Sequence, residues 1–476
     1  MASTKTIHCA AVDLGATSGR VIVGAWNGRK LALTEVHRFA NQFRSLGGHD
    51  YWDLPGLWAE ITTGLREAKR RFPKLASVGV DTWGVDFVLV NDTGRMVFPA
   101  HAYRDARTQP GLQRLANTRA ALERIYAATG IPNVFYNSSL QLEETVARCP
   151  AVADIATRCL FLPDYFNFLL SGRMENEISF ASTTQLLDVH GMDWSRATLD
   201  HFHVPAFWFT KPIFAGTVLG PVRDFQELKG VKVVAVPGHD TACAYDAMPA
   251  SPAGGDLYIS AGTWSLVGFE SDRPVLGHAA LAARISNERI GDGRYRPLTN
   301  VIGLWLLEQT LKEFSARPKT DREWTKLIKR SALLPAFNFH LDVTDPAFIN
   351  PASMRAAIDA QLKQRKLPLP KTPAGYVRLI CDSLGQGHAD ALRAFEQLAG
   401  RKFQRILVVG GGSKNRLLCQ ATADASGLPV HAFTLEGTAV GNIANQLVGL
   451  KAVPNLKAFR EHFSRQIKAT IYQPKV

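Results

Sequence analysis

Three consecutive extended segments open this chain, and their order constrains its fold more than any other feature. Residues 7–14, 20–26 and 31–39 are runs rich in apolar and β-branched side chains. Asn27-Gly28, between the second and third runs, is a strong short-range signal for a β-hairpin. We therefore predict three antiparallel strands in succession at the N-terminal end of the chain.

The segment that follows has the signature of an amphipathic helix. Asp53 is placed to cap it, and Pro55 stands in its first turn. An apolar face recurs at helical spacing, at Leu57, Ile61, Leu65 and Ala68. Residues 78–90 then return to strand character. The order strand-strand-strand-helix-strand is typical of a ribonuclease-H-like half-domain and differs from a Rossmann unit, in which strands and helices alternate from the start.

Part of this opening pattern recurs in the second half of the chain. Residues 257–269 again predict a strand, a turn of small residues with Gly and Thr, and a second strand. The stretch 248–255, rich in Pro, Gly and Ala, precedes this recurrence and is the best candidate for a domain boundary. A chain of 476 residues also exceeds what a single core normally supports. We predict an α/β protein with two ribonuclease-H-like domains, residues 1–247 and 248–476, flanking a hinged catalytic cleft, with the last helices free to pack back on the hinge.

Charge and cysteine content argue against several classes of function. The net charge is +13, but the basic residues are scattered along the chain, as on solvated helix faces, so we expect no nucleic-acid partner. The six cysteines form no CxxC pair and no zinc-ligand cluster, which predicts free thiols in a reducing compartment. The sequence shows no leader and no long apolar window, so we expect a soluble cytoplasmic protein without membrane contact. Nothing in the sequence predicts an oligomeric state.

The turn between the first two predicted strands has the composition of a phosphate-binding loop. Small residues let backbone N–H groups approach a phosphate, hydroxyl groups donate hydrogen bonds, and a guanidinium adds positive charge. The residues concerned are Ala16, Thr17, Ser18, Gly19 and Arg20. Asp13, at the end of the preceding strand, could hold Mg²⁺ through water. The alternative is an ordinary hairpin turn, since the chain has no GxxxxGK[ST] motif.

Two glycine-containing turns in the second half have a related composition. Thr263 lies in the turn of the recurring hairpin and could contact the phosphates from a second side. Gly411 lies in a run of three glycines between a predicted strand and a predicted helix at about residues 415–426. Such a turn lets the backbone pass close to an adenine or a ribose. The alternative for both is a flexible turn without a ligand.

An aspartate stands where a strand ends and a helix begins, in the sequence GHDT. Asp240 can accept a proton from a substrate hydroxyl there, as phosphoryl transfer to an alcohol requires. The alternative for Asp240 is a helix N-cap. His239 beside it is expected to orient a group rather than to act as a base. Gly84 would let a sugar approach the backbone, and Trp83 is either a platform for the sugar ring or a core residue.

Together these stretches resemble the FGGY carbohydrate kinases of the actin-like ATPase superfamily over nearly the whole chain. The resemblance is carried by AVDLGATSGRV, VDTWGVDFVL, GHDTA, SAGTWSLVGFE, VVGGGSKN and EGTAVGNIANQ, in this order. It implies an enzyme that uses ATP and Mg²⁺ to phosphorylate a ketose at its 1-hydroxyl. TWGVDFVL and the GLWLL run favour the branch that acts on L-rhamnulose, with L-fuculose or a pentulose as alternatives. An alternative of a different class is a sugar or ATP sensor on the same fold that has no turnover.

The resemblance also implies a role for each candidate residue. Asp240 matches the proton acceptor, in a first domain that binds the sugar and carries the first phosphate hairpin. The second domain would bind the nucleotide. The nucleotide contacts implied are Ala16, Thr17, Ser18, Gly19, Arg20, Thr263, Glu308 and Gly411. The sugar contacts implied are Gly84, His239, Asp240, Thr241 and Asn300.

Two places depart from the family pattern. Glu308 stands where the pattern has a glutamine that contacts the nucleotide. A carboxylate at that position repels phosphate unless it faces the ribose or a cation. Residues 131–140 also differ from the pattern. If they line the sugar pocket, the preferred sugar differs as well.

Overall fold

The chain forms two compact units, and each is assembled from segments distant in sequence. The computed structural model describes residues 6–251, 254–315, 317–349 and 351–475. The first unit comprises Met1–Pro249, Glu270–Pro297 and Glu436–Gln466. The second comprises Ala250–Phe269, Leu298–Leu435 and Ile467–Val476. Both compact units are discontinuous along the chain, so they cannot be compared directly with a single boundary between residues 247 and 248. That boundary stays a prediction.

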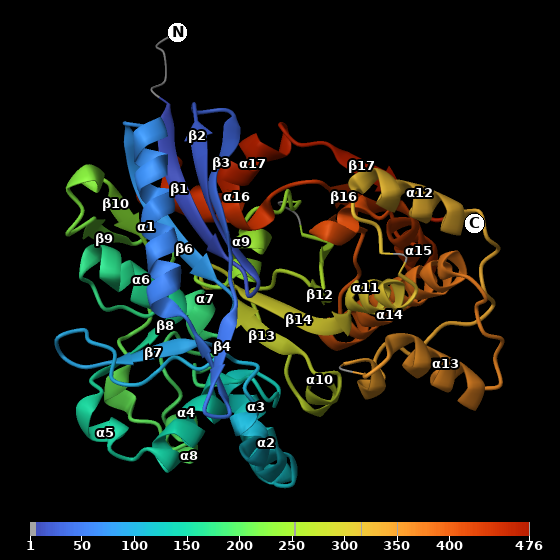
Figure 1. Cartoon of the computed structure of the whole chain (residues 1–476), viewed down its shortest axis with the longest axis horizontal. Coiled ribbons are helices and arrows are strands. Elements are labelled where there is room, and N and C mark those ends of the chain that lie inside the picture. The colour runs from blue at the N-terminus through green and yellow to red at the C-terminus, as the bar shows by residue number, and fades with distance from the viewer. Residues whose placement is uncertain (1–5, 252–253, 316, 350, 476) are drawn as a thin grey trace. The chain divides into compact units, whose positions relative to one another are not determined.

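A six-stranded mixed sheet lies at the centre of the first unit (Figure 1). The strands, in sheet order, are β3 (Leu31–Ala40), β2 (Ser18–Trp26), β1 (Ile7–Leu14), β6 (Leu75–Thr82), β10 (Lys232–Val234) and β9 (Val218–Pro221). β1, β2 and β3 are antiparallel neighbours, β6 and β10 run parallel to β1, and β9 is antiparallel to β10. The predicted succession of three antiparallel strands is confirmed.

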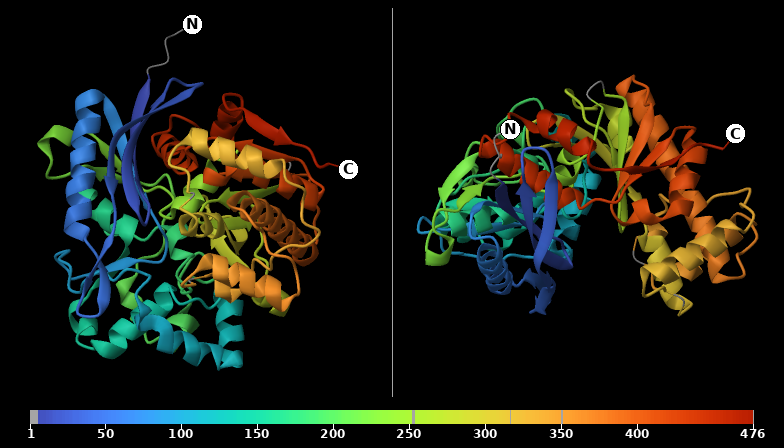
Figure 2. Two further views of the ribbon diagram at one scale, coloured as in Figure 1. Left: turned by 45° about the vertical axis from the view of Figure 1, so that its right-hand side comes forward. Right: turned by 90° about the horizontal axis from the view of Figure 1, so that it is seen from above.

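Helices cover both faces of this sheet. The predicted helix is α1 (Leu54–Arg71), and Asp53 caps it by accepting a 2.9 Å hydrogen bond from the N–H of Gly56. At Gly64 a Cβ atom would lie 2.4 Å from the side chain of Val21, so this glycine lets α1 approach the sheet closely. Both views of Figure 2 show the N-terminal strands between α1 and two red C-terminal helices. These helices are α16 (Gly437–Gly449) and α17 (Leu456–Ser464).

The strand character predicted for residues 78–90 is confirmed on both sides of a break. Two strands occupy this stretch, β6 and β7 (Phe87–Val90), and β7 pairs with β8 (Arg158–Phe161) in a separate small sheet. The break lies at Val85, whose φ of +70° is incompatible with a strand and uncommon for a β-branched residue.

The rest of the first unit is mostly helical. The helices between β7 and β9 are α2 (Gln109–Ala116), α3 (Arg119–Thr129), α4 (Ser138–Arg148), α5 (Val152–Ile155), α6 (Leu162–Ser171), α7 (Ile178–Ala181) and α8 (Arg196–His201). The other elements of this unit are the hairpin β4–β5 (Phe43–Leu46 and His49–Trp52), α9 (Asp240–Asp246), α10 (His278–Ala282) and β13 (Ser286–Arg289). β14 (Tyr295–Ile302) starts in the first unit and ends in the second.

The second unit contains a mixed sheet of the same design. Its strands, in sheet order, are β14, β12 (Trp264–Gly268), β11 (Asp256–Ala261), β15 (Arg405–Val409), β16 (Val430–Phe433) and β17 (Ala469–Tyr472), and β13 precedes β14 in this order. β11, β12 and β14 are antiparallel neighbours, β15 and β16 run parallel to β11, and β17 is antiparallel to β16. The sequence of strand directions is therefore the same as in the first unit, and the predicted recurrence of the opening pattern is confirmed at the level of topology.

The helices of the second unit include one of 27 residues, α14 (Pro373–Ala399). α14 packs against α15 (Arg416–Ser426), and Gly385 permits their contact, because a Cβ there would lie 2.6 Å from the backbone of Ala421. The others are α11 (Trp305–Glu313), α12 (Asp321–Ala332) and α13 (Met354–Gln364). In the described ranges, none of the helices has the length and apolar character required to cross a lipid bilayer.

Candidate active site

The first predicted phosphate loop is a tight turn at the end of β1. The N–H of Gly15 donates to the carbonyl of Ser18 across 2.9 Å, and Asn41 holds the turn by donating to the carbonyls of Gly15 and Thr17. Ala16 is half-buried, whereas Thr17 and Ser18 are exposed, so their hydroxyls can reach a ligand. Gly19 is buried against Phe39, and a Cβ there would lie 2.3 Å from that ring. The turn thus has the shape and the exposed donors that phosphate binding requires.

Arg20 is already paired with two carboxylates. Its Nε donates to Oδ2 of Asp13 across 2.9 Å, and its Nη1 lies 2.6 Å from Oε2 of Glu436. Burial raises the pKa of Asp13, while the charge of Arg20 acts in the opposite direction. Glu436 is more than half exposed, so its ion pair with Arg20 lies in high dielectric and contributes little to stability. Arg20 can exchange this partner for a phosphate and keep Asp13.

Two aspartates lie next to each other at the C-terminal ends of β1 and β6. Asp13 and Asp81 are register partners in this parallel pair. Oδ2 of Asp81 accepts a 2.6 Å hydrogen bond from Asn442, whereas its buried Oδ1 has no partner among the described residues. Burial, with the nearby charge of Asp13, raises the pKa of Asp81 well above its ordinary value.

The described residues contain no cluster of three or more His, Cys, Asp or Glu side chains that could enclose a metal ion. A Mg²⁺ ion that keeps most of its water needs only one or two carboxylates together with phosphate oxygens. Asp13, with the unpaired oxygen of Asp81 beside it, fits that modest requirement.

Asp240 occupies the first turn of α9 but does not cap it. The N-cap residue is His239, so the interpretation of Asp240 as a plain N-cap is wrong. Oδ1 of Asp240 accepts a 3.0 Å hydrogen bond from the hydroxyl of Thr241 and lies 3.4 Å from Nε2 of His239. The Asp240 side chain is 31% exposed, which leaves it accessible to a substrate.

A buried glutamate that sequence reasoning missed holds the loop before Asp240. Oε2 of Glu177, at the N-terminus of α7, accepts a 2.8 Å hydrogen bond from the N–H of Gly238. The same oxygen accepts hydrogen bonds from Ser179 and Phe180. On the other side of the loop, the carbonyl of Gly238 accepts from the N–H of Thr82 across 2.9 Å. These contacts fix the backbone from which His239 and Asp240 project.

Gly84 lies against His239. A Cβ atom on Gly84 would come within 3.3 Å of Nε2 of His239, so a larger residue would push the imidazole away. Trp83 is only 5% exposed, and its indole N–H donates to Asp86 across 2.8 Å. Trp83 is therefore a core residue, and Gly84 is the part of this loop that is in contact with His239.

The backbone next to Gly84 is held in a strained conformation by buried hydrogen bonds. The carbonyl of Val85 accepts a 2.6 Å hydrogen bond from the hydroxyl of Ser138. Asp86 accepts hydrogen bonds from the indoles of Trp52 and Trp83 and from the amide of Gln141. Burial raises the pKa of Asp86 to about 6, although these hydrogen bonds oppose the shift. Strained residues of this kind persist where the surrounding structure over-determines them, commonly at binding sites.

His239 is in contact with a buried ion pair that sequence reasoning also missed. Nη2 of Arg296, a residue with 0% exposure, lies 2.5 Å from Nδ1 of His239 and donates to Oε2 of Glu288. Burial opposes ionisation of Glu288, but the charge of Arg296 and the hydrogen bond from Ser286 outweigh it and lower the pKa of Glu288 to about 2. Glu288 and Arg296 therefore remain a charged pair at neutral pH.

The second unit holds the other predicted nucleotide residues. Thr263 is exposed in the turn between β11 and β12, and its carbonyl accepts the N–H of Gly303 across 3.1 Å. A Cβ on Gly303 would lie 2.6 Å from the carbonyl of Gly262, so this contact requires glycine. Gly411 is exposed after β15, and a Cβ added there would meet only the side chain of Leu304, at 4.0 Å, among the described residues. The predicted strand–glycine–helix turn is confirmed.

Glu308 and Asn300 are also in the second unit. Glu308 lies on α11, one turn after Leu304, and forms an ion pair with Arg317 across 3.5 Å. The positive charge of Arg317 offsets the negative charge of Glu308, the carboxylate whose place beside a nucleotide the sequence put in doubt. Asn300 is exposed on β14, opposite Leu266 of β12. Gly84, His239, Asp240, Thr241 and the first phosphate turn all belong to the first unit, whereas Asn300 belongs to the second.

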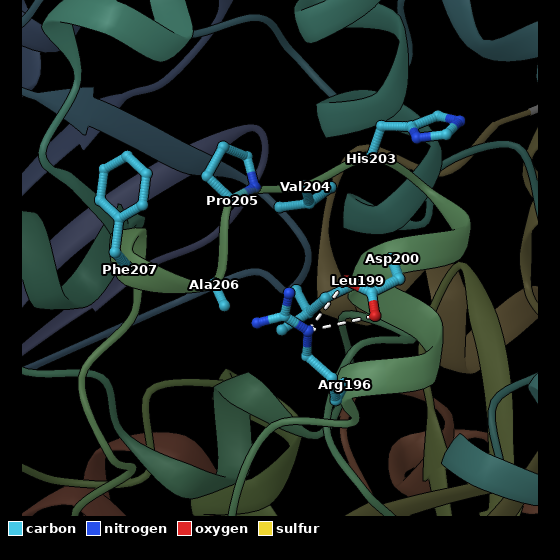
Figure 3. A pocket seen from close by; sticks show the side chains of 8 residues that line it. All are labelled: Arg196, Leu199, Asp200, His203, Val204, Pro205, Ala206 and Phe207. Atoms are coloured by element: carbon cyan, nitrogen blue, oxygen red, sulfur yellow. Dashed lines mark hydrogen bonds and ion pairs between the residues drawn. The ribbon is translucent and has the colours of Figure 1, made fainter.

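A surface hollow of the first unit contains none of these residues. It has a volume of about 790 Å³ and follows α8 and the loop after it (Figure 3). Arg196 and Asp200 form an ion pair at 2.9 Å inside it, and Phe207 projects from its rim. Nothing at this hollow resembles the chemistry of the Asp240 region.

Comparison with known proteins agrees with the division of the fold into two related units. Residues 8–245 match the N-terminal domain, and residues 257–450 the C-terminal domain, of the FGGY family of carbohydrate kinases. The chain is 40% identical to a rhamnulokinase of Klebsiella pneumoniae subsp. pneumoniae over 98% of this chain and 94% of that protein. It is 39% identical to a rhamnulokinase of Enterobacter sp. (strain 638), with the same coverage.

Solved structures share the fold at low sequence identity. A gluconate kinase from Lactobacillus acidophilus superimposes with a TM-score of 0.79 at 14% identity, over 99% of this chain and 94% of that one. A xylulose kinase from Rhodospirillum rubrum gives a TM-score of 0.77 at 18% identity, over 99% and 94%. The predicted two-domain α/β fold is thereby confirmed. By its sequence and by its two domain matches, this chain belongs to the FGGY family of carbohydrate kinases and is a phosphotransferase.

Proposed function

We propose that this enzyme transfers the γ-phosphoryl group of ATP to the 1-hydroxyl of a ketose, with L-rhamnulose as the preferred acceptor. The choice of sugar is supported by identity of 40% to curated rhamnulokinases over 98% of the chain. The observation that carries the choice of base is Asp240, an accessible carboxylate at the start of α9 that, among the described residues, accepts hydrogen bonds through Oδ1 alone. A cytoplasmic location, where ATP is abundant, is part of the same proposal.

The reaction needs few groups from the protein. Asp240 accepts the proton of the sugar O1 as that oxygen bonds to the γ-phosphorus, and the bond from phosphorus to the bridging oxygen of ADP breaks. Such transfer depends on positioning and on stabilisation of charge at the phosphoryl oxygens. Mg²⁺, held through water by Asp13, would neutralise charge on the phosphates. Arg20 keeps Asp13 in place for this role.

The remaining candidates divide between the two substrates. The exposed turn of Thr17 and Ser18 is proposed to bind phosphate through its N–H and hydroxyl groups, together with Ala16, Gly19 and Arg20. Thr263, Glu308 and Gly411 are proposed as the other nucleotide contacts. The proposed sugar contacts are Gly84, His239, Asp240, Thr241 and Asn300.

The segment that departs from the family pattern lies where it can affect sugar choice. Ser138 and Gln141, at the start of α4, donate hydrogen bonds to the carbonyl of Val85, next to Gly84. Asn137 in turn holds the preceding loop by donating to the carbonyl of Pro132 across 2.9 Å. A change in residues 131–140 would therefore shift the loop that carries Gly84. L-fuculose and a pentulose are the alternative acceptors for this reason.

A panel of ketoses tests the proposal. Purified enzyme with Mg-ATP is assayed for ADP release with L-rhamnulose, L-fuculose, L-ribulose and D-xylulose. We expect the highest kcat/KM with L-rhamnulose, by about tenfold or more, because a site built to hydrogen-bond particular hydroxyls rejects analogues that leave its groups unpaired. If ATP binds but no ketose stimulates ADP release, the proposed activity is wrong and a sensor without turnover accounts for the fold.

Glu308 gives a second prediction. Replacing Glu308 by glutamine removes a negative charge from the proposed nucleotide side and frees Arg317 from its ion pair. We expect the KM for ATP to fall by about two- to fivefold with kcat unchanged, since an exposed charge near phosphate is worth about 1 kcal/mol. Glu313→Gln, on the same helix but bonded to Ser353, is the matched control. A tenfold rise in the KM for ATP would instead mean that the Glu308 carboxylate makes a favourable contact with the nucleotide.

A further inference from the structure

Two buried charged residues contact Nδ1 of His239, whereas Nε2 of the same ring faces Asp240. Arg296 on β14 has 0% exposure, and its Nη2 is 2.5 Å from Nδ1 of His239. The same nitrogen donates to Oε2 of Glu288 on β13, and Nε of Arg296 donates to the backbone carbonyl of Arg289 across 3.1 Å. Both residues belong to the same unit as His239. The guanidinium is therefore fixed in place and cannot move away from the imidazole.

This contact decides which nitrogen of His239 carries the proton. A guanidinium is a donor only and has no lone pair to accept a hydrogen bond. At 2.5 Å from Arg296, Nδ1 must therefore present its lone pair. Oε2 of Glu288 also lies 3.2 Å from Nδ1 and would accept a proton there, but a hydrogen on Nδ1 would collide with the closer Arg296. The neutral imidazole is thus protonated at Nε2.

The Nε2–H group faces the reacting carboxylate. Nε2 is 3.4 Å from Oδ1 of Asp240, and the same oxygen accepts the hydroxyl of Thr241 at 3.0 Å. Within the described parts of the chain, no residue donates a hydrogen bond to Oδ2 of Asp240. The Thr241 hydroxyl therefore holds the carboxylate by Oδ1, with Nε2 of His239 beside that oxygen, and leaves Oδ2 for the substrate.

We propose that Glu288 and Arg296 are positioning residues of the phosphoryl transfer, which hold His239 in its Nε2–H form so that Oδ2 of Asp240 takes the proton of the sugar hydroxyl. The identity of the substrate in this inference rests on the proposed function. The assignment of the imidazole proton does not depend on it. His239 itself then acts only as a donor. Glu288 balances the charge of Arg296, which allows a guanidinium to remain buried next to the imidazole of His239.

The tautomer is measured directly, without substrate. The protein is labelled with ¹⁵N at its 13 histidines, and the His239 signals are assigned by their loss in His239→Gln. Wild-type protein should show a protonated Nε2 and an unprotonated Nδ1. In Arg296→Met the donor to Nδ1 is gone and Glu288 remains 3.2 Å away, so a proton should appear on Nδ1.

A second variant distinguishes this role from simple structural support. In Arg296→Met combined with Glu288→Gln, the new amide can donate to Nδ1 and restore the Nε2–H form without a buried unpaired charge. We expect kcat to fall about 10–100-fold in Arg296→Met, the effect of losing a charge-assisted hydrogen bond, with the KM for ATP unchanged. The double variant should recover at least about tenfold of this loss.

Arg289→Met is the matched control. Arg289 is an equally buried arginine, but its side chain bonds to the carbonyls of Val189, Gly191 and Gly293 and not to His239. It should lower stability and leave the tautomer and the kcat of the folded protein unchanged.

Three results would overturn the inference: a proton on Nδ1 in wild type, an unchanged tautomer in Arg296→Met, or equal losses of kcat in Arg296→Met and Arg289→Met. If the wild-type tautomer is as expected but no ketose is phosphorylated, the proposed function fails and the assignment of the imidazole proton stands. If Arg296→Met does not fold, the wild-type spectrum and the double variant still decide.

Discussion

Replacing Asp240 by asparagine should lower kcat by about 10³-fold, within the range of about 10²–10⁴ for loss of a general base. Asparagine has nearly the same shape and can still accept the hydrogen bond of Thr241 at the position of Oδ1. It cannot take a proton from the sugar hydroxyl. Because the proposed nucleotide contacts are elsewhere, ATP affinity by calorimetry should stay within about threefold of wild type.

The control for Asp240→Asn is the same change at an aspartate outside the site. Asp200 on α8 is 59% exposed and pairs with Arg196 at the surface hollow, so Asp200→Asn should leave kcat and the KM for ketose unaltered. Retention of more than about a tenth of wild-type kcat in Asp240→Asn would remove Asp240 from the role of base. A large loss of ATP affinity in the same variant would indicate that its carboxylate binds the nucleotide complex instead.

Gly441→Ala should have the largest effect on stability. α16 crosses α9 at this glycine, and a Cβ there would lie 1.8 Å from the carbonyl oxygen of Cys243. The obstacle is backbone, which cannot rotate away as a side chain can, so one of the two helices must move. We expect a loss of at least about 3 kcal/mol in the free energy of unfolding.

The same substitution should also reduce activity, because α9 begins with Asp240. A displacement of about 1 Å at a reacting group can cost about 10²-fold in rate. Thermal unfolding and kcat measured well below the transition give the two effects separately. Gly111→Ala on α2 is the control, since its Cβ would meet only flexible side-chain ends such as that of Glu143, at 3.2 Å. A variant at 441 that is as stable as the control would contradict the close helix crossing.

Local sequence patterns were sufficient to predict the helices and strands that are determined by their own residues. The three N-terminal strands follow from their apolar runs and the Asn27-Gly28 turn, and α1 follows from its cap at Asp53 and its periodic face. The break at Val85 could not be predicted, because its positive φ is imposed by hydrogen bonds from α4, which the local pattern does not contain. The membership of α16 in the first unit also depends on tertiary packing.

The candidate site divides in the same way. Asp240, Gly84 and the phosphate turn are recognisable because their residue types suit the chemistry and because the family motifs are contiguous. Glu177 and Arg296 are not recognisable in this way, since they act on the GHDT segment from 61 and 57 residues away along the chain. A buried charge without a motif gives no signal in a single sequence. Only the fold shows that these two side chains hold the loop and the imidazole beside Asp240.

The most direct test of the account is the identity of the product formed by the wild-type enzyme from L-rhamnulose and Mg-ATP. With ¹³C at carbon 1 of the sugar, we expect one phosphorylated product whose labelled carbon shows coupling to phosphorus, formed in equal amount to ADP. A product phosphorylated at another hydroxyl would contradict the proposed position of transfer. ADP formed without any sugar phosphate would contradict the claim that Asp240 directs the phosphoryl group to a ketose.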